Sequence, residues 1–229
     1  MVIHIITRST RLQNLKTVKE SVFSKVPKGL KINWHVMFDT ATLKDIDAEL
    51  LSDLKDKSTK YYFEKGDAVG MLYPQSSELI STLKNGWVYF LDDDNVIHPD
   101  FYERILKLVK KDSTKKVHTF SQQVDGKDFT GLKFRMVNPN SVKKHEIDLA
   151  QFIASVDVYN EHGYKFEADY CADGILIEQV HKDHPEWFTY TIDELCYYNA
   201  LEKKSTANVP KILYIGEDEP VLKLSLIHI

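Results

Sequence analysis

Long apolar runs and cysteines are both scarce in this sequence. A helix that crosses a bilayer needs about 20 consecutive apolar residues, and the longest apolar stretches here are only strand length, so we expect no transmembrane segment. Residues 1–6 carry neither a basic leader nor an apolar segment long enough for a secretory signal. The only two cysteines, Cys171 and Cys196, are therefore expected to be reduced thiols in a cytoplasmic protein. A disulfide between them, and peripheral contact with the cytosolic membrane face, are left open.

Basic residues are not in excess either. The 30 lysines and arginines are outnumbered by 34 acidic residues, and no basic stripe is interleaved with aromatic residues, so nucleic acid is not an expected partner. The sequence also lacks a Ser-His-Asp order, a Walker-type glycine loop and a G-x-G-x-x-G fingerprint. These absences argue against acyl transfer, P-loop phosphoryl transfer and classical dinucleotide binding.

Apolar strands alternate with amphipathic helices through the first half of the chain. The expected strands are residues 2–6, 32–38, 61–63 and 88–91, and a further pair at 117–124 and 132–137. Near-continuous apolar strands are typical of a buried parallel sheet. The pattern predicts an α/β protein, a three-layer α/β/α sandwich whose central sheet is mostly parallel, with a small antiparallel excursion in the second half.

The second half is more mixed. Short helices are expected at residues 149–153, 172–181 and 193–203, and strands at 187–191 and 212–215. No internal repeat or low-complexity linker is visible, so we expect a single domain over residues 1–221, with one half at 1–110 and the other at 111–221. Residues 222–229 form an apolar, uncapped ending that resembles a translated adapter tail, and they carry no functional argument.

Three consecutive carboxylates, Asp92, Asp93 and Asp94, stop the apolar strand at residues 88–91. Adjacent acids repel one another unless a cation shares them, and ligand crevices in α/β sheets form at the carboxyl ends of strands. On an extended segment Asp92 and Asp94 share one face, and Asp93 points the other way. Carboxylate oxygens suit Mg²⁺ or Mn²⁺, and one or two of them leave coordination positions for a diphosphate. The ordinary alternative is a solvated acidic loop.

Two other carboxylate sites fit this pattern poorly. An EF-hand loop that begins at Asp92 would need glycine at its sixth position, which is Ile97, although the twelfth, Glu103, is acidic. Haloacid-type phosphatases carry Asp-x-Asp after the first strand, which here ends in Thr7 and Arg8.

The strand Val-Tyr-Phe-Leu-Asp-Asp-Asp-Asn, with a first strand ending in Thr-Arg and a second ending in Asp, resembles the GT-A type nucleotide-sugar glycosyltransferases. It is similar both to the family-2-like group and to the glucuronyltransferases with an Asp-Asp-Asp motif, well over residues 1–110 and loosely beyond. The resemblance implies a Rossmann-like GT-A fold whose first half binds the nucleotide-sugar donor and whose second half binds the acceptor. It also implies Mn²⁺ or Mg²⁺ as cofactor, a donor expected to be a UDP-sugar, and a hydroxyl acceptor on a glycan, lipid-linked or protein-linked molecule.

The resemblance assigns Asp94 to the metal, with Asp92 as a second candidate ligand. Asp92 or Asp93 would contact the ribose or a metal-bound water. His181 or His184 would complete the metal site, as a histidine of the second half does in some GT-A enzymes. The alternative for both histidines is an ordinary surface position, because Pro185 ends their helix and no third ligand is evident.

Four residues of the first half match the nucleotide pocket of such enzymes. Asp39 would read the nucleobase, Thr7 and Arg8 would line the same pocket, and Arg11 would reach a phosphate. The glycine-containing loop at residues 64–73 would close over the donor. Asp39 as a helix N-cap, and Arg8 as a surface loop residue, are the ordinary alternatives.

Inverting transfer requires a general base for the acceptor hydroxyl, and the second half should supply it. Asp173, in an Ala-Asp-Gly sequence before an apolar helix, is the first candidate, and Asp169 is the second. Asp148 and Gln151 resemble the element that holds the donor sugar or the acceptor. A helix N-cap explains Asp173 equally well, and a capped short helix explains Asp148 and Gln151.

Two other functions remain open. A sugar-nucleotide nucleotidyltransferase would also use an α/β sheet and carboxylate-bound magnesium, but the loop at residues 7–11 lacks the glycines that such enzymes carry after the first strand. A non-catalytic carbohydrate or nucleotide-sugar binding module would keep the triplet for calcium.

Overall fold

The computed structural model describes residues 1–43, 46, 48–66, 72–124, 134–198 and 200–201. Its strands are β1 (Val2–Ser9), β2 (Lys31–Asp39), β3 (Thr59–Glu64), β4 (Trp87–Phe90), β5 (Val96–Ile97), β6 (Val117–Val124), β7 (Phe134–Arg135), β8 (Phe152–Ser155) and β9 (Phe188–Tyr198). Its helices are α1 (Leu15–Phe23), α2 (Ala48–Leu54), α3 (Tyr73–Ser81), α4 (Phe101–Lys111), α5 (Val156–Asn160) and α6 (Ala172–Asp183). Short 3-10 turns are η1 (Leu12–Asn14), η2 (Pro139–Ser141), η3 (Leu149–Gln151) and η4 (Pro185–Trp187).

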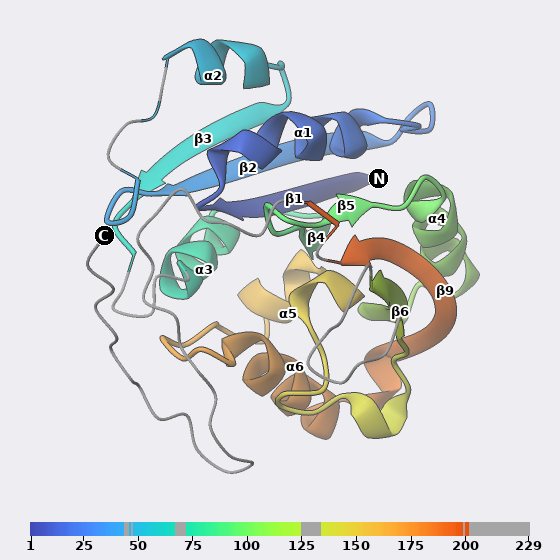
Figure 1. The fold of residues 1–229 in the computed structure, drawn as a ribbon. Coiled ribbons are helices and arrows are strands. Elements are labelled where there is room, and N and C mark those ends of the chain that lie inside the picture. Colours follow the sequence, from blue (N-terminus) through green and yellow to red (C-terminus); the bar gives the residue numbers. More distant parts are fainter. Residues whose placement is uncertain (44–45, 47, 67–71, 125–133, 199, 202–229) are drawn as a thin grey trace.

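The described strands form one nine-stranded sheet, in the order β3-β2-β1-β4-β8-β6-β9-β5, with β7 paired to β6 (Figure 1). The pairs β3-β2, β2-β1 and β1-β4 are parallel. Parallel neighbours require crossover connections, which α1, α2 and α3 provide. The carboxyl ends of these strands therefore lie at one edge of the sheet.

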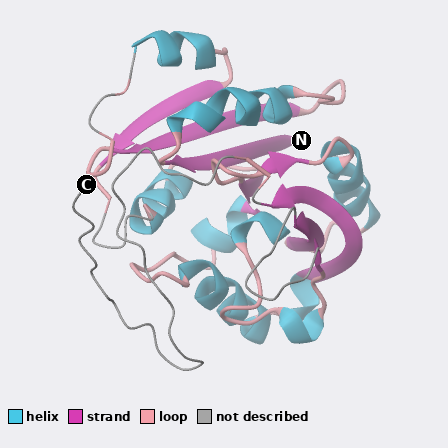
Figure 2. Ribbon diagram, in the orientation of Figure 1, coloured by secondary structure: helices cyan, strands magenta, loops and turns pink. Residues whose placement is uncertain are grey.

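Helices cover both faces of the sheet (Figure 2). Alternate side chains of the strands pack in opposite directions: Ile6, Met37 and Phe90 belong to the core beneath α3, α5 and α6. Ile5 and Trp34 belong to the second core, beneath α1, α2 and α4. The predicted three-layer α/β/α sandwich is thus confirmed, and burial on both faces explains the near-continuous apolar sequence of β1.

Antiparallel pairing enters in the second half, as expected. β8 runs antiparallel to β4 and β6, and β5 runs antiparallel to β9, whereas β6 and β9 are parallel. Two predictions fail here. Residues 193–198 belong to β9 and not to a helix, since they pair with β6 and β5. The helix expected at residues 149–153 is only the turn η3, because residues from Phe152 onward pair as β8.

Some expectations fall outside the described residues. They include the strand at residues 212–215, the tail at 222–229, the end of the helix expected at 193–203, part of the strand at 132–137 and the central part of the loop at 64–73. Over the described part of the chain, no helix combines the length and the apolar character needed to span a bilayer.

Candidate functional site

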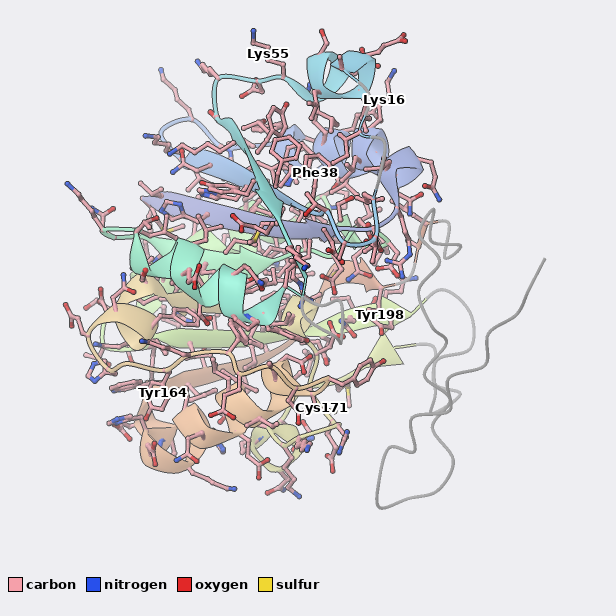
Figure 3. The ribbon with its side chains drawn as sticks, turned by 90° about the vertical axis from the view of Figure 1, so that its left-hand side faces the viewer. Lys16, Phe38, Lys55, Tyr164, Cys171 and Tyr198 are labelled. Carbon is pink, nitrogen blue, oxygen red and sulfur yellow. The ribbon has the colours of Figure 1, made fainter. Side chains whose placement is uncertain are left out.

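The predicted nucleotide-site residues of the first half gather at the carboxyl edge of the parallel strands. Arg8 lies near the end of β1, Asp39 ends β2, and residues 92–94 follow β4. In Figure 1, β1 and β3 point toward the left of the view, and Figure 3 shows the molecule from that side. In such sheets the crevice outside this edge is where ligands bind.

Arg8 is paired with the first acid of the triplet. Its Nη2 donates to Oδ1 of Asp92 over 2.9 Å, and its guanidinium lies 4.3 Å from the centre of the Tyr73 ring. Only 8% of Arg8 is exposed, so it is not a surface loop residue. Burial alone would lower the pKa of Arg8, but Asp92 and Tyr73 together outweigh it through charge and hydrogen bonding, so the pKa is raised. This edge of the sheet therefore carries a fixed positive charge beside Asp92.

Asp93 fastens the triplet to the loop after β1. Its Oδ2 accepts hydrogen bonds from the backbone N–H of Thr10 at 2.7 Å and of Arg11 at 2.6 Å, and its Oδ1 accepts from Nη1 of Arg11. The residue is 1% exposed. Burial raises the pKa of Asp93, and Arg11 opposes that shift. Both carboxylate oxygens of Asp93 are therefore bound to this loop.

The triplet is not extended, contrary to the sequence expectation. The backbone N–H of Asn95 donates to the carbonyl of Asp92 over 3.0 Å, which closes a turn at residues 93–94. Asp93 and Asp94 consequently face the same side chain, Arg11, whose Nη2 lies 3.5 Å from Oδ2 of Asp94. Strict alternation along a strand therefore does not describe these three acids.

Asp94 sits in surroundings that favour a cation. It is 8% exposed, and its pKa is raised to about 7, first by burial and then, against the opposing charge of Arg11, by Asp92, Asp93 and Asp148. In the described residues, no cluster of three or more acidic, histidine or cysteine side chains is arranged to hold a metal. Mg²⁺ and Mn²⁺ at nucleotide sites need only one or two carboxylates, with phosphates and waters completing the shell, so Asp94 and Asp92 fit such an ion.

Asp39 presents one free acceptor in a buried position. Its Oδ1 accepts from the backbone N–H groups of Ala41 and Gly66, each at 2.9 Å, while its Oδ2 is buried without a hydrogen-bond partner. The Ala41 bond, together with the bond from the Leu43 N–H to the Asp39 carbonyl, is of the kind made at a helix or turn start, while α2 begins at Ala48. A fully buried carboxylate with one unsatisfied oxygen is costly unless a ligand N–H donates to it.

Thr7 has a different position from the one expected. Its side chain is fully buried, and its Oγ1 accepts a hydrogen bond from Nε1 of Trp34 at 2.9 Å. Thr7 thus fixes Trp34 in the core beneath α1, α2 and α4 and supports the strand that carries Arg8.

Asp173 reaches the same site from the second half. It lies in the first turn of α6, whose N-cap is Cys171, so Asp173 is not the cap itself. Its pKa is raised to about 7, first by burial and then by the charge of Asp148 and, more weakly, of Asp92; the Gly174 N–H and Arg8 oppose the shift. The charges of Asp148, Arg8 and Asp92 all act on Asp173, so the start of α6 belongs to the electrostatics of this sheet edge.

The glycine after Asp173 allows this position. A Cβ on Gly174 would lie 2.9 Å from the Cα of Lys144, closer than real Cβ atoms approach backbone. The N-terminus of α6 therefore packs directly on residues 143–145, and the Asp-Gly pair noted in the sequence has a steric reason. Cys171, labelled in Figure 3, marks this end of the helix.

Asp148 and Gln151 form the capped turn that was their ordinary alternative. Oδ1 of Asp148 accepts from the N–H of Ala150 at 2.9 Å and from Nε2 of Gln122 at 3.0 Å, and Oε1 of Gln151 accepts from the N–H of Asp148 at 3.0 Å. Gln151 is fully buried. The charge of Asp148 nevertheless acts on both Asp94 and Asp173, so it belongs to the electrostatics of the site.

The other second-half candidates have partners of their own. His181 shares a 2.7 Å hydrogen bond with the Tyr190 hydroxyl, and it lies eight residues beyond Asp173 on α6, roughly 12 Å along the helix axis. His184 stacks on Trp187 with 3.6 Å between ring centres. Oδ1 of Asp169 accepts from the N–H of Cys171 at the start of α6. None of these contacts joins the triplet.

Three residues of the site escaped the sequence reasoning: Tyr73, Gly66 and Gln122. The Tyr73 ring packs against the guanidinium of Arg8. The Gly66 N–H donates to Asp39, and the Gln122 side chain donates to Asp148. Gly66 and Tyr73 had a signal, since both lie in the loop at residues 64–73 that was expected to close over the donor. Gln122 had none, because its role depends on which strands meet.

Known proteins resemble this chain in structure rather than in sequence. No protein-family description and no curated protein matches the sequence. Solved structures do match: S. aureus TarS 1–349 in complex with UDP-GlcNAc has a TM-score of 0.60 at 11% identity, over 92% of this chain and 62% of that one. The complex of TarS 1–349 with UDP has a TM-score of 0.61 at 11% identity, over 86% and 60%. The longer TarS structure has a TM-score of 0.61 at 13% identity, over 86% and 36%.

This likeness concerns the fold. The chain spans between 36% and 62% of the length of these three neighbours. The match shows that the chain shares the α/β fold of these neighbours, in agreement with the sheet described above.

Proposed function

We propose that this chain is a metal-dependent glycosyltransferase that moves a sugar from a nucleotide diphosphate donor to a hydroxyl acceptor. The observation that carries the proposal is the convergence of Arg8, Asp39 and Asp92–Asp94 at one sheet edge, with Asp173 brought to it from α6. This group of charged residues includes a buried carboxylate oxygen without a partner, on Asp39, and a carboxyl of raised pKa, on Asp173. The first suits recognition of a nucleobase, and the second suits a proton acceptor.

The proposed donor is a UDP-sugar. Uracil carries an imide N–H that can donate to a carboxylate, and Oδ2 of Asp39 is a buried acceptor without a partner. The similar TarS structures were solved with UDP and with UDP-GlcNAc, which supports a uridine donor on a fold of this type. Asp92, held in place by Arg8, would contact the ribose.

The metal would be held by Asp94, with Asp92 as second ligand and the donor phosphates completing its shell. Bound there, Mn²⁺ or Mg²⁺ would neutralise the charge that develops on the leaving diphosphate. Asp94 contributes a nearly buried carboxylate whose neighbours are mostly negative, and Arg11 lies beside it with a guanidinium suited to phosphate.

Asp173 is the proposed base of an inverting transfer. Its Oδ1 accepts from the Gly174 N–H over 2.8 Å, which orients the carboxylate in the first turn of α6. Deprotonated Asp173 would take the proton of the acceptor hydroxyl as that oxygen forms its bond to the anomeric carbon, while the bond to the diphosphate breaks on the opposite side. A pKa of about 7 suits a base that works near neutral pH.

A panel of nucleotide sugars, scored by thermal shift with Mn²⁺ present, tests the donor. Ligands that bind only the folded state raise its apparent stability by mass action. We expect UDP and UDP-sugars to raise Tm more than ADP, GDP or CDP counterparts. Stabilisation by Ca²⁺ alone, with no response to any nucleotide, would favour a carbohydrate-binding module instead. Release of pyrophosphate from UTP and a sugar 1-phosphate would favour a nucleotidyltransferase.

A further inference from the structure

Arg11 occupies an unusual place between two acids of the triplet. Its Nη1 donates to Oδ1 of Asp93, and its Nη2 lies 3.5 Å from Oδ2 of Asp94. About a quarter of the Arg11 side chain is exposed, whereas Asp93 and Asp94 are nearly buried. The guanidinium of Arg11 therefore faces both Asp93, which binds the loop after β1, and Asp94, the proposed metal ligand.

The backbone of Arg11 is held independently of its side chain. The N–H groups of Thr10 and Arg11 both donate to Oδ2 of Asp93, at 2.7 and 2.6 Å. The loop would keep these two bonds if the guanidinium moved away. The backbone of Arg11 is thus fixed. One arm of its guanidinium binds Asp93, and the other is directed at Asp94.

We propose that Arg11 is an internal counter-cation that occupies Asp94 when no donor is bound, and that it competes with the divalent metal for that carboxylate. This inference rests on the proposed function. When metal and donor bind together, the Nη2 arm exchanges Asp94 for an oxygen of the donor diphosphate, and the metal takes its place at Asp94. Metal and donor then bind as partners, and neither binds well alone.

Charge supports this exchange. Asp94 lies near Asp92, Asp93 and Asp148, so a cation at Asp94 lowers the repulsion among four carboxylates. In the donor-free protein, the guanidinium of Arg11 supplies part of the positive charge that these carboxylates require. A donor diphosphate brings new negative charge, which gives the Nη2 arm of Arg11 a new partner and leaves Asp94 to the metal.

Calorimetric titration of Mn²⁺ into the nucleotide-free protein tests the competition directly. We expect Arg11→Gln to bind Mn²⁺ about tenfold more tightly than the wild type, because one opposing charge beside a carboxylate changes its affinity for cations by about that factor. In saturating Mn²⁺, the same variant should bind UDP about tenfold more weakly, since it lacks the guanidinium for phosphate. Arg11→Lys, which keeps the charge without the fork, should lie between the two in both titrations.

Arg104→Gln serves as the matched control. Arg104 is a half-exposed arginine on α4 whose guanidinium lies 3.9 Å from Asp193, outside the site, and its removal should change neither titration. A thermal melt of each variant checks folding.

Unchanged or weaker Mn²⁺ binding by Arg11→Gln, or unchanged UDP binding, would overturn the inference. Failure of the wild type to bind UDP at all would overturn the proposed function, and in that case the Mn²⁺ titrations alone would still decide whether Arg11 competes at Asp94.

Discussion

The backbone N–H of Gly66 donates to Oδ1 of Asp39 over 2.9 Å, and a Cβ on Gly66 would fall 2.7 Å from Oδ2 of the same carboxylate. The two residues come from different strand ends, β3 and β2, which are adjacent in the sheet. Gly66 therefore does two things for Asp39: it holds one oxygen, and it leaves the room that the other oxygen occupies. Asp39 can keep its free acceptor only while residue 66 has no side chain.

Gly66→Ala should weaken UDP binding without unfolding the protein. The added methyl group must push the Asp39 carboxylate away, and the buried acceptor loses its orientation toward the base. We expect the Kd for UDP to rise by about tenfold, the effect of one misplaced hydrogen bond to a charged group. Titration calorimetry measures it, and Gly163→Ala is the control, since no atom lies within 4 Å of a Cβ there. The control residue has positive φ, so its Tm is expected to fall slightly while its UDP affinity stays. Equal affinity in wild type and Gly66→Ala would show that Asp39 does not read the base.

Asp39→Asn should change base selectivity rather than abolish binding. The amide oxygen can still accept from Ala41 and Gly66, which leaves an N–H₂ group where the free carboxylate oxygen was. This amide N–H₂ group cannot bond to the N–H of uracil, because both are donors, but it can donate to the unprotonated ring nitrogen of cytosine. The ratio of UDP to CDP affinity should therefore fall by tenfold or more, on the order of one lost hydrogen bond and one gained. Parallel titrations with UDP and CDP give this ratio, and an unchanged ratio contradicts the assignment.

Activity should depend on pH through Asp173. A general base must be deprotonated, and the pKa of Asp173 is raised to about 7 by burial and by Asp148, so kcat/KM should fall about tenfold per pH unit below pH 7 and level off above it. Asp173→Asn should bind UDP and lose transfer at every pH. Full activity of this variant would move the base elsewhere.

The same carboxyl also links stability to pH. Because its folded pKa is about 7 and its ordinary value is 3.8, the folded state binds more protons between these limits, and Asp173 lowers stability increasingly as the pH rises through that window. Asp173→Asn removes this effect. The gain in Tm over the wild type should therefore be larger at pH 8 than at pH 5, and a gain independent of pH would contradict the raised pKa.

Asp148 should tune that base from a distance. Its charge is the largest effect after burial that raises the pKa of Asp173. Asparagine is as good a helix cap as aspartate, so Asp148→Asn should keep the bonds to Ala150 and Gln122 while it removes the charge. The acid limb of the pH–rate profile should move to lower pH, with UDP affinity nearly unchanged. A limb that stays in place would mean that the two carboxylates do not interact.

The parallel half of the fold follows from the sequence because its signals are local. Buried parallel strands are apolar throughout, so residues 2–6, 32–38 and 88–91 stand out, and strands that run in one direction must end at one edge. The residues that follow β2 and β4 are thus brought together by strand direction alone. The predicted bounds of 117–124 coincide with β6.

The second half follows less well because its strands depend on distant partners. β8 has only four residues and would pass for part of a helix, yet it lies between β4 and β6. Residues 193–198 contain acidic and aromatic residues at helical spacing, but pairing with β5 and β6 decides their conformation. Long-range pairing overrides local preference in both places.

For the site, residue types were easier to predict than contacts. The charge of Asp148 acts on both Asp94 and Asp173, whereas Asp93 binds the loop of Arg11, since a turn replaces the extended geometry on which alternation depends. The packing of Arg8 on Tyr73 depends on α3 crossing beneath the strand ends, which no local pattern indicates.

Hydrolysis of a UDP-sugar tests the central claim most directly, because it needs no knowledge of the acceptor. Wild-type protein with Mn²⁺ should release UDP slowly from the best donor in the thermal-shift panel, chelation of the metal should stop the release, and Asp94→Ala should abolish it while the variant melts cooperatively. Asp100→Ala removes an exposed acid outside the site and should retain the wild-type rate. Release of UDP by Asp94→Ala at the wild-type rate, or no release by the wild type despite tight UDP-sugar binding, would contradict a metal-dependent glycosyltransferase built on this triplet.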